Sequence, residues 1–138
     1  MPGFEIIDHA ADYAVRARGR DLRELIEAAG RGLIALTVAT EGLTPSEQRA
    51  ISANADTPEI LLVHALREML YLLEDEGLVA VGFDVLHAEG GSVSAQVDCV
   101  PLEAVRDRLL GHIKAVTYHD LVVREVDGEL QVEIVFDT

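Results

Sequence analysis

The dipeptide Asp127-Gly128 stands between two apolar runs near the end of the chain, a strong short-range signal for a β-hairpin. With a two-residue loop, Val126 faces Glu129 and the pairing continues outward. One face is then apolar throughout, and a slip of one residue would bury the polar face instead. This register predicts a strand that reaches almost to the last residue, with these facing pairs: Glu125 with Leu130, Val123 with Val132, Leu121 with Ile134, His119 on the apolar side with Phe136, and Tyr118 with Asp137.

Two segments have the spacing and end signals of helices. The first, over residues 21–37, opens with an Asp-x-x-Glu cap and carries one apolar stripe. Its Gly30 and Gly32 weaken a helix intrinsically and indicate close packing on a sheet. The second, over residues 57–77, has a Thr-Pro start and a glycine stop. It is apolar nearly all round, so we expect it to be the more buried of the two.

The remaining apolar runs predict strands around these helices. Gly90-Gly91 indicates a second hairpin, and residues 101–110 show no clear pattern beyond one helical turn. No repeat or linker divides the chain, so residues 1–138 are expected to form a single α+β domain. The predicted strands are 4–8, 13–18, 48–55, 78–88 and 93–100.

The charge balance limits the partners of this chain. Asp plus Glu number 25 against 11 Lys plus Arg, for a net charge of −14, while 49% of the residues are apolar. The chain is therefore not of the disordered class. The densest basic stretch, residues 16–23, is followed at once by glutamates, which argues against autonomous nucleic-acid binding. An acidic surface suits a basic protein partner, a divalent cation or simple solubility.

Several classes of site are excluded by what the sequence lacks. Its single cysteine, Cys99, excludes an intrachain disulfide, and its place in an alternating strand predicts a buried hydrophobe rather than a nucleophile. We find no zinc-protease, P-loop, nucleophile-elbow or dinucleotide motif. No apolar run is long enough for a membrane span and the start lacks a signal peptide, so we expect a cytoplasmic protein.

Three segments could carry chemistry. The run 8–12, Asp-His-Ala-Ala-Asp, offers hard oxygen ligands to a divalent ion, although aspartates that cap a local turn are the commoner case. The run 114–120, Lys-Ala-Val-Thr-Tyr-His-Asp, combines a cation, a phenol, an imidazole and a carboxylate, although an ordinary edge strand would look similar. At the C-terminus, the predicted strand would hold the Asp137 carboxylate beside the α-carboxylate of Thr138.

In their order along the chain, these three segments resemble the archease family. The resemblance covers essentially the whole chain, and its most specific part is the Lys-Ala-Val-Thr-Tyr-His string. It implies an α+β layer sandwich in which a mixed β-sheet packs on two main helices. Position 10 is an alanine where the family usually has threonine, which leaves the carboxylates intact.

The resemblance also implies a function. Archeases are accessory proteins of the GTP-dependent RNA-splicing ligase of the RtcB type, in tRNA splicing or RNA repair. They promote guanylylation of the ligase and its multiple turnover, and they do not themselves form the covalent nucleotide intermediate. An archease would contact RNA only indirectly, through the ligase. The residues implied in activation are Asp12, Lys114 and Asp137.

The implied metal ligands are Asp12 and Asp137. The C-terminal residue Thr138 would add a further ligand, and Asp8, His9 and Tyr118 would surround the ligands without binding the ion directly. Carboxylates suit Ca²⁺, Mg²⁺ and Mn²⁺ alike. Two other functions stay open, namely a stand-alone metal-dependent phosphoester enzyme and a non-catalytic chaperone or scaffold.

Overall fold

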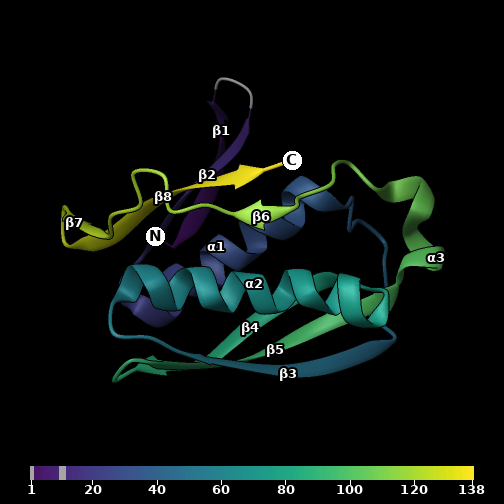
Figure 1. The fold of residues 1–138 in the computed structure, drawn as a ribbon, viewed down its shortest axis with the longest axis horizontal. Helices are drawn as coiled ribbons and strands as arrows, with labels where there is room; N and C mark the ends of the chain where they lie inside the picture. The colour runs from purple at the N-terminus through teal and green to yellow at the C-terminus, as the bar shows by residue number, and fades with distance from the viewer. Residues whose placement is uncertain (1, 10–11) are drawn as a thin grey trace.

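The computed structural model describes residues 2–9 and 12–138, with backbone positions alone for residues 8, 9 and 12. Two antiparallel sheets enclose a layer of helices (Figure 1). The first sheet contains β1 (Gly3–His9), β2 (Asp12–Gly19), β6 (Ala115–Val116), β7 (Arg124–Val126) and β8 (Glu129–Asp137). The second contains β3 (Glu47–Asn54), β4 (Leu78–Glu89) and β5 (Ser92–Pro101). The helices are α1 (Leu22–Thr37), α2 (Pro58–Glu76), α3 (Leu102–Val105) and a 3-10 turn, η1 (Arg106–Arg108).

The α+β layered class is confirmed, but the expected single mixed sheet is not. Every strand pair among the described residues is antiparallel, and the strands form two sheets. The physical reason lies in the connections. The stretch that contains α1 leads from the first sheet to the second. The stretch that contains α2 joins β3 to β4, which run parallel to each other but are separated by β5, and β5 is antiparallel to both, so no two parallel strands are paired.

Both long helices begin and end where the sequence predicts. Asp21 caps α1 by accepting a hydrogen bond from the Glu24 amide at 2.9 Å. Thr57 caps α2 by accepting one from the Ile60 amide at 3.2 Å, and Gly77 ends it with φ +66°. These local signals lie within a few residues of the helix ends, which explains why the sequence alone was sufficient.

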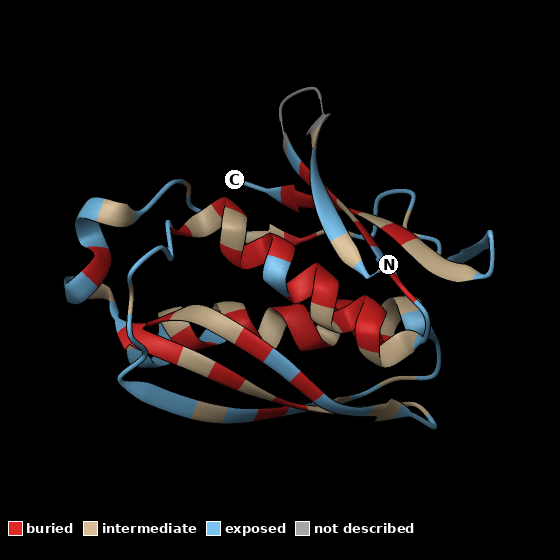
Figure 2. Cartoon of the chain, turned by 180° about the vertical axis from the view of Figure 1, so that it is seen from behind, coloured by how far each residue is buried: buried red, intermediate tan, exposed pale blue. Residues whose placement is uncertain are grey.

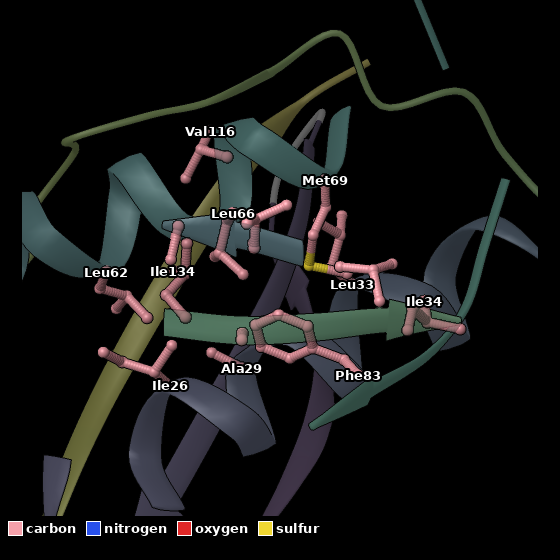
Figure 3. Packing of buried hydrophobic residues seen from close by; sticks show 14 of the residues in the cluster. Ile26, Ala29, Leu33, Ile34, Leu62, Leu66, Met69, Phe83, Val116 and Ile134 are labelled. Atoms are coloured by element: carbon pink, nitrogen blue, oxygen red, sulfur yellow. The ribbon is translucent and has the colours of Figure 1, made fainter. Parts of the chain in front are cut away.

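The expectation that the second helix would be the more buried was wrong. In α1, small residues allow close contact with both sheets, and Gly30 lies directly against the Phe83 ring. One side of α2 faces solvent instead, where Tyr71 is 45% exposed. Figure 2 shows the burial along both helices and the inner strands. Side chains from all three layers meet in the core (Figure 3), among them Leu33, Leu66, Met69, Phe83, Val116 and Ile134.

The predicted C-terminal hairpin is confirmed only near its turn. Asp127 and Gly128 both have positive φ, and the pairs from Val126–Glu129 to Arg124–Gln131 follow the expected register. Beyond Arg124 the chain leaves the sheet, and it returns at Val116, which pairs with Phe136, and Ala115, which pairs with Asp137.

The predicted partners of residues 118–123 were therefore wrong. The chain makes a turn in which the Leu121 amide donates to the Tyr118 carbonyl at 3.2 Å, with Asp120 at φ +50°. The return to the sheet is displaced by three residues from the predicted register. Because three is odd, the two faces exchange, and Val116 takes the inner position that was predicted for His119. His119 is exposed, not in the core.

Candidate functional site

One end of the first sheet brings together residues from all three candidate segments. Tyr13 on β2 pairs with Phe136 on β8, and Phe136 pairs with Val116 on β6. The next position on β2 is Asp12, whose other neighbour is His9, and the next on β8 is Asp137, whose other neighbour is Ala115. The pairing of β2 with β8 ends at Tyr13 and Phe136, so Asp12 and Asp137 each lie one residue beyond it, and His9, Asp12, Asp137 and Ala115 form a row of strand ends at this end of the sheet. We call this row the carboxylate row.

The antiparallel register makes the carboxylate row a suitable place for a metal ion. Facing residues on neighbouring antiparallel strands have Cα atoms about 4.5–5.5 Å apart and occupy the same face of the sheet. Asp12 and Asp137 each adjoin the facing pair Tyr13–Phe136, and aspartates supply the hard oxygen donors that divalent cations prefer. Asp8 belongs to the neighbouring row, where it pairs with Tyr13, which in turn pairs with Phe136.

The side chains of the N-terminal candidates lie outside what the structure describes. This applies to Asp8, His9 and Asp12, and position 10 is likewise outside the described residues. Asp137 and Thr138 are both exposed. Within the described part of the chain, no group of three His, Cys, Asp or Glu side chains is placed to hold a metal. The metal site therefore stays a prediction, supported by the positions of the strands.

Lys114 is attached to the carboxylate row through its backbone. Its amide donates to the Asp137 carbonyl at 2.8 Å, and its side chain is exposed. Among the described residues, the Lys114 ammonium makes no ion pair with a carboxylate. Lys114 is also the only lysine in the entire sequence. Counting lysines would have singled it out, and the sequence analysis did not use this signal.

The segment 117–123 is attached to α2 at both ends. The Arg67 guanidinium lies 5.3 Å from the centre of the Tyr118 ring, and the Val123 amide donates to the Glu59 carboxylate at 2.8 Å. Tyr118 therefore contacts α2 instead of facing Asp137 as predicted. Arg67 and Glu59 are further residues that the sequence analysis missed, because no local pattern links them to a segment more than 50 residues away.

The arginine-rich stretch 16–23 is not a free basic patch. Arg16 pairs with Glu5 and Glu133, at 3.1 and 3.2 Å. Arg20 pairs with Glu24 at 2.7 Å, and this contact, together with a hydrogen bond from the Arg20 amide, lowers the pKa of Glu24 from 4.5 to about 2. Neighbouring carboxylates thus neutralise much of its positive charge.

Cys99 is a core residue, as predicted. Its side chain is fully buried, and burial raises the pKa of the thiol from 9.0 to about 11. A thiol with such a pKa carries almost no thiolate at neutral pH, so Cys99 is not a nucleophile.

Comparison with known proteins assigns the family. The model of the archease protein family matches residues 4–138. The chain belongs to the archease family. Protein archease of Thermococcus kodakarensis is 31% identical over 141 residues, which cover 99% of both chains, and that of Pyrococcus abyssi is 28% identical with the same coverage. The resemblance read from the three segments is thus confirmed.

Solved structures share the fold. The solution structure of protein 1598 from Methanobacterium thermoautotrophicum is similar with a TM-score of 0.78 and 22% identity, and 99% of each chain is covered. The crystal structure of an archease from Thermotoga maritima, described as a possible chaperone, has a TM-score of 0.67 and 22% identity, with 96% of this chain and 94% of that chain covered. In the described residues, no helix is both long and apolar enough to cross a membrane.

Proposed function

We propose that this archease is an accessory protein of a GTP-dependent RNA ligase of the RtcB type. It would promote guanylylation of the ligase and its repeated turnover, and it would form no covalent nucleotide intermediate of its own. The observation that carries the proposal is the carboxylate row, because the strand register brings Asp12, Asp137 and the backbone of Lys114 to one end of one sheet.

The residues of this end suit work on phosphate groups. Asp12 and Asp137, with the α-carboxylate of Thr138 after them, would hold a divalent ion of the Ca²⁺, Mg²⁺ or Mn²⁺ class. When bound, such an ion neutralises phosphate charge during nucleotidyl transfer on the ligase. The exposed ammonium of Lys114 would add a second positive charge at this end of the sheet, free of carboxylate partners in the part of the chain that the structure describes.

The overall charge also supports a protein partner of basic character. With a net charge of −14, this archease would be drawn towards a ligase that binds RNA through a basic surface. Contact with RNA would then pass through the ligase, in line with the pairing of Arg16 and Arg20 by glutamates.

The test follows guanylylation of the RtcB-type ligase from the same organism with GTP and a divalent metal, with and without this protein. We expect faster and repeated guanylylation with the wild type and no stimulation with Asp137→Ala. Equal rates with and without a folded wild-type sample would contradict the proposal. Full stimulation by Asp12→Asn, Lys114→Gln and Asp137→Asn would point instead to a scaffold without chemistry.

The single lysine allows an independent check of where the ligase binds. An amine-reactive crosslinker can join this archease to the ligase at Lys114 or at the N-terminal amine, and peptide mapping separates the two. A crosslink from Lys114 to residues near the nucleotide site of the ligase is expected. Crosslinks that map only to the N-terminal amine, with Lys114 still freely modified in the complex, would contradict the proposal.

A further inference from the structure

We propose that the open edge of β1 is a strand-addition site for an extended segment of the partner, in which a Lys or Arg stands between two large apolar residues. Such a segment would extend the first sheet by pairing with the backbone of β1. The identity of the partner as the ligase rests on the proposed function. The residues that would recognise the segment, Phe4, Glu5 and Ile6, are none of those assigned to metal binding or activation.

The described strands leave four sheet edges, and three of them are blunted against strand addition. At the edge of β4, side chains of α1 take the place of a strand. The Glu27 carboxylate accepts from the Val85 amide at 3.0 Å, and the Arg23 guanidinium donates to the Val85 carbonyl at 3.2 Å. The edge formed by β6 and β7 is broken into stretches of two and three residues. β3, which the structure describes from end to end, exposes no large hydrophobic side chain. Short, covered or polar edges are the usual protection of a sheet.

β1 has none of these protections. It pairs with β2 without a break from Gly3 to His9, and among the described residues it has no partner on its other side. The strand contains no Pro, Lys or Arg. Figure 2 shows β1 on the outside of the first sheet, where residues 4–6 are exposed. Backbone amide and carbonyl groups along such an edge point away from the sheet and can pair with another strand.

The inner face of β1 calls for apolar residues on the added segment. Phe4 faces Ala17 and Ile6 faces Val15, and both partners are fully buried, so Phe4 and Ile6 lie on the core face of the sheet. Phe4 is nevertheless 40% exposed and Ile6 54% exposed. A further strand would place apolar side chains beside both and remove this surface from water.

The outer face calls for a basic residue between them. Glu5 faces Arg16, which faces Glu133, and the Arg16 guanidinium binds the two carboxylates at 3.1 and 3.2 Å. One guanidinium between two carboxylates leaves a net negative charge, and the Glu5 side chain is 59% exposed. A Lys or Arg opposite Glu5 would continue the alternation of charges across the sheet. Its two neighbours in the segment would then face Phe4 and Ile6.

A second copy of this chain fits the edge less well than such a segment. Its β1 has no Lys or Arg to place opposite Glu5, and two chains with a net charge of −14 repel each other. β1 also ends at His9, in the carboxylate row. A segment paired along β1 would therefore lead the partner towards the end of the sheet that carries the proposed function.

Two model peptides test the edge without the ligase. One is capped Ser-Thr-Val-Lys-Val-Thr-Ser, the other has Glu in place of Lys, and binding is followed by NMR chemical shifts of the isotope-labelled protein. We expect the shift changes to centre on β1, with the Lys peptide binding several-fold tighter at low salt and the difference shrinking as salt is raised. Glu5→Lys should reverse the preference, which a merely structural role of Glu5 would not produce. Equal affinities for the wild type, or no binding of either peptide at millimolar concentration, would overturn the strand-addition site.

The ligase itself tests the same edge through a matched pair of substitutions. Ile6→Asp places a charge on the apolar side of the edge, and Leu86→Asp is the control, because Leu86 is 66% exposed on β4 of the other sheet. Calorimetry should show binding to the purified ligase weakened roughly tenfold in Ile6→Asp and unchanged in Leu86→Asp, with full stimulation of guanylylation by both at saturation. Hydrogen exchange should slow in β1 and not in β3 when the ligase binds. Wild-type affinity in Ile6→Asp without protection of β1 would overturn the proposal.

The strand-addition site and the proposed function can fail separately. Peptide binding at β1 with no binding of the ligase would support the site and contradict the proposed function. Loss of stimulation at saturation in Asp137→Ala, with normal binding, concerns the proposed function alone. A wild-type dimer in sedimentation that Ile6→Asp converts to a monomer would overturn the proposal in favour of a second copy of the chain.

Discussion

In the second sheet, every residue of β5 from Ser92 to Pro101 has a partner on β4, and β3 pairs along most of the other edge. In the first sheet, β6 and β7 pair with the same edge of β8. This pairing is interrupted because the chain leaves the sheet between Val116 and Arg124. The continuous sheet supplies stability and carries no candidate residue. Lys114 and the segment 117–123 lie at the edge of the interrupted sheet. They contain the most specific part of the family resemblance.

This difference indicates a division of labour between the two sheets. Regular pairing leaves little freedom to position a side chain, whereas a segment that leaves the sheet can be held by contacts with another element, as Tyr118 and Val123 are held by α2. Changes in the continuous part should therefore alter stability without altering function, and changes at the end of β8 should do the reverse.

The largest expected effect on stability comes from Gly30 in α1. A Cβ atom at this position would lie 2.2 Å from Cδ2 of Phe83, and that ring is fully buried. Gly-to-Ala in a helix normally stabilises by about 1 kcal/mol, but here we expect Gly30→Ala to destabilise by about 2 kcal/mol because of overpacking. Denaturant unfolding measures the change. Combining it with Phe83→Leu should recover part of the loss, and strictly additive losses would contradict the packing argument.

The next effect concerns the start of α1 and depends on pH. Because the pKa of Glu24 is lowered from 4.5 to about 2 in the folded protein, the carboxylate contributes stability above pH 4.5 that is lost as the pH falls towards 2. We expect Glu24→Gln to unfold at a lower temperature than the wild type at pH 7, with the difference closing near pH 2. A difference that stays constant from pH 7 to pH 2 would rule out the Arg20 pairing as its cause.

A smaller effect is expected where the interrupted segment is attached to α2. Glu59→Ala removes the acceptor of the Val123 amide and should cost about 1 kcal/mol. Hydrogen exchange should rise in residues 117–123 and stay unchanged in β4 and β5. Glu68→Ala, on the same helix, is the matched control. Equal exchange in the two variants would show that Glu59 does not hold this segment.

The elements of the fold follow from local signals that the sequence contains. Asp21, Thr57 and Gly77 delimit the helices, and Asp127-Gly128 sets the last turn, because each acts on backbone groups within a few residues. The register beyond Arg124 could not be predicted in this way. An alternating pattern does not reveal that the chain leaves the sheet, since the stabilising contacts come from Glu59 and Arg67 on a distant helix.

The candidate site shows the same limit. The sequence identifies the three segments, and the prediction that the C-terminal strand runs almost to the end of the chain is confirmed by β8. The sequence could not show that Asp12 and Asp137 both adjoin the pair Tyr13–Phe136. That pair joins β2 and β8, which come from opposite ends of the chain. The relative burial of the helices was mispredicted for a similar reason, since burial depends on the position of α1 between both sheets.

The most direct measurement compares divalent metal binding at the two ends of β8. Asp137→Asn and Asp127→Asn make the same charge change at exposed positions, and Asp127 lies in a turn with φ +53°, where asparagine is well tolerated. Titration calorimetry with Ca²⁺ and Mn²⁺ should show wild-type affinity in Asp127→Asn and at least roughly tenfold weaker binding in Asp137→Asn. Wild-type affinity in Asp137→Asn would contradict the assignment of the carboxylate row as the functional end of this archease.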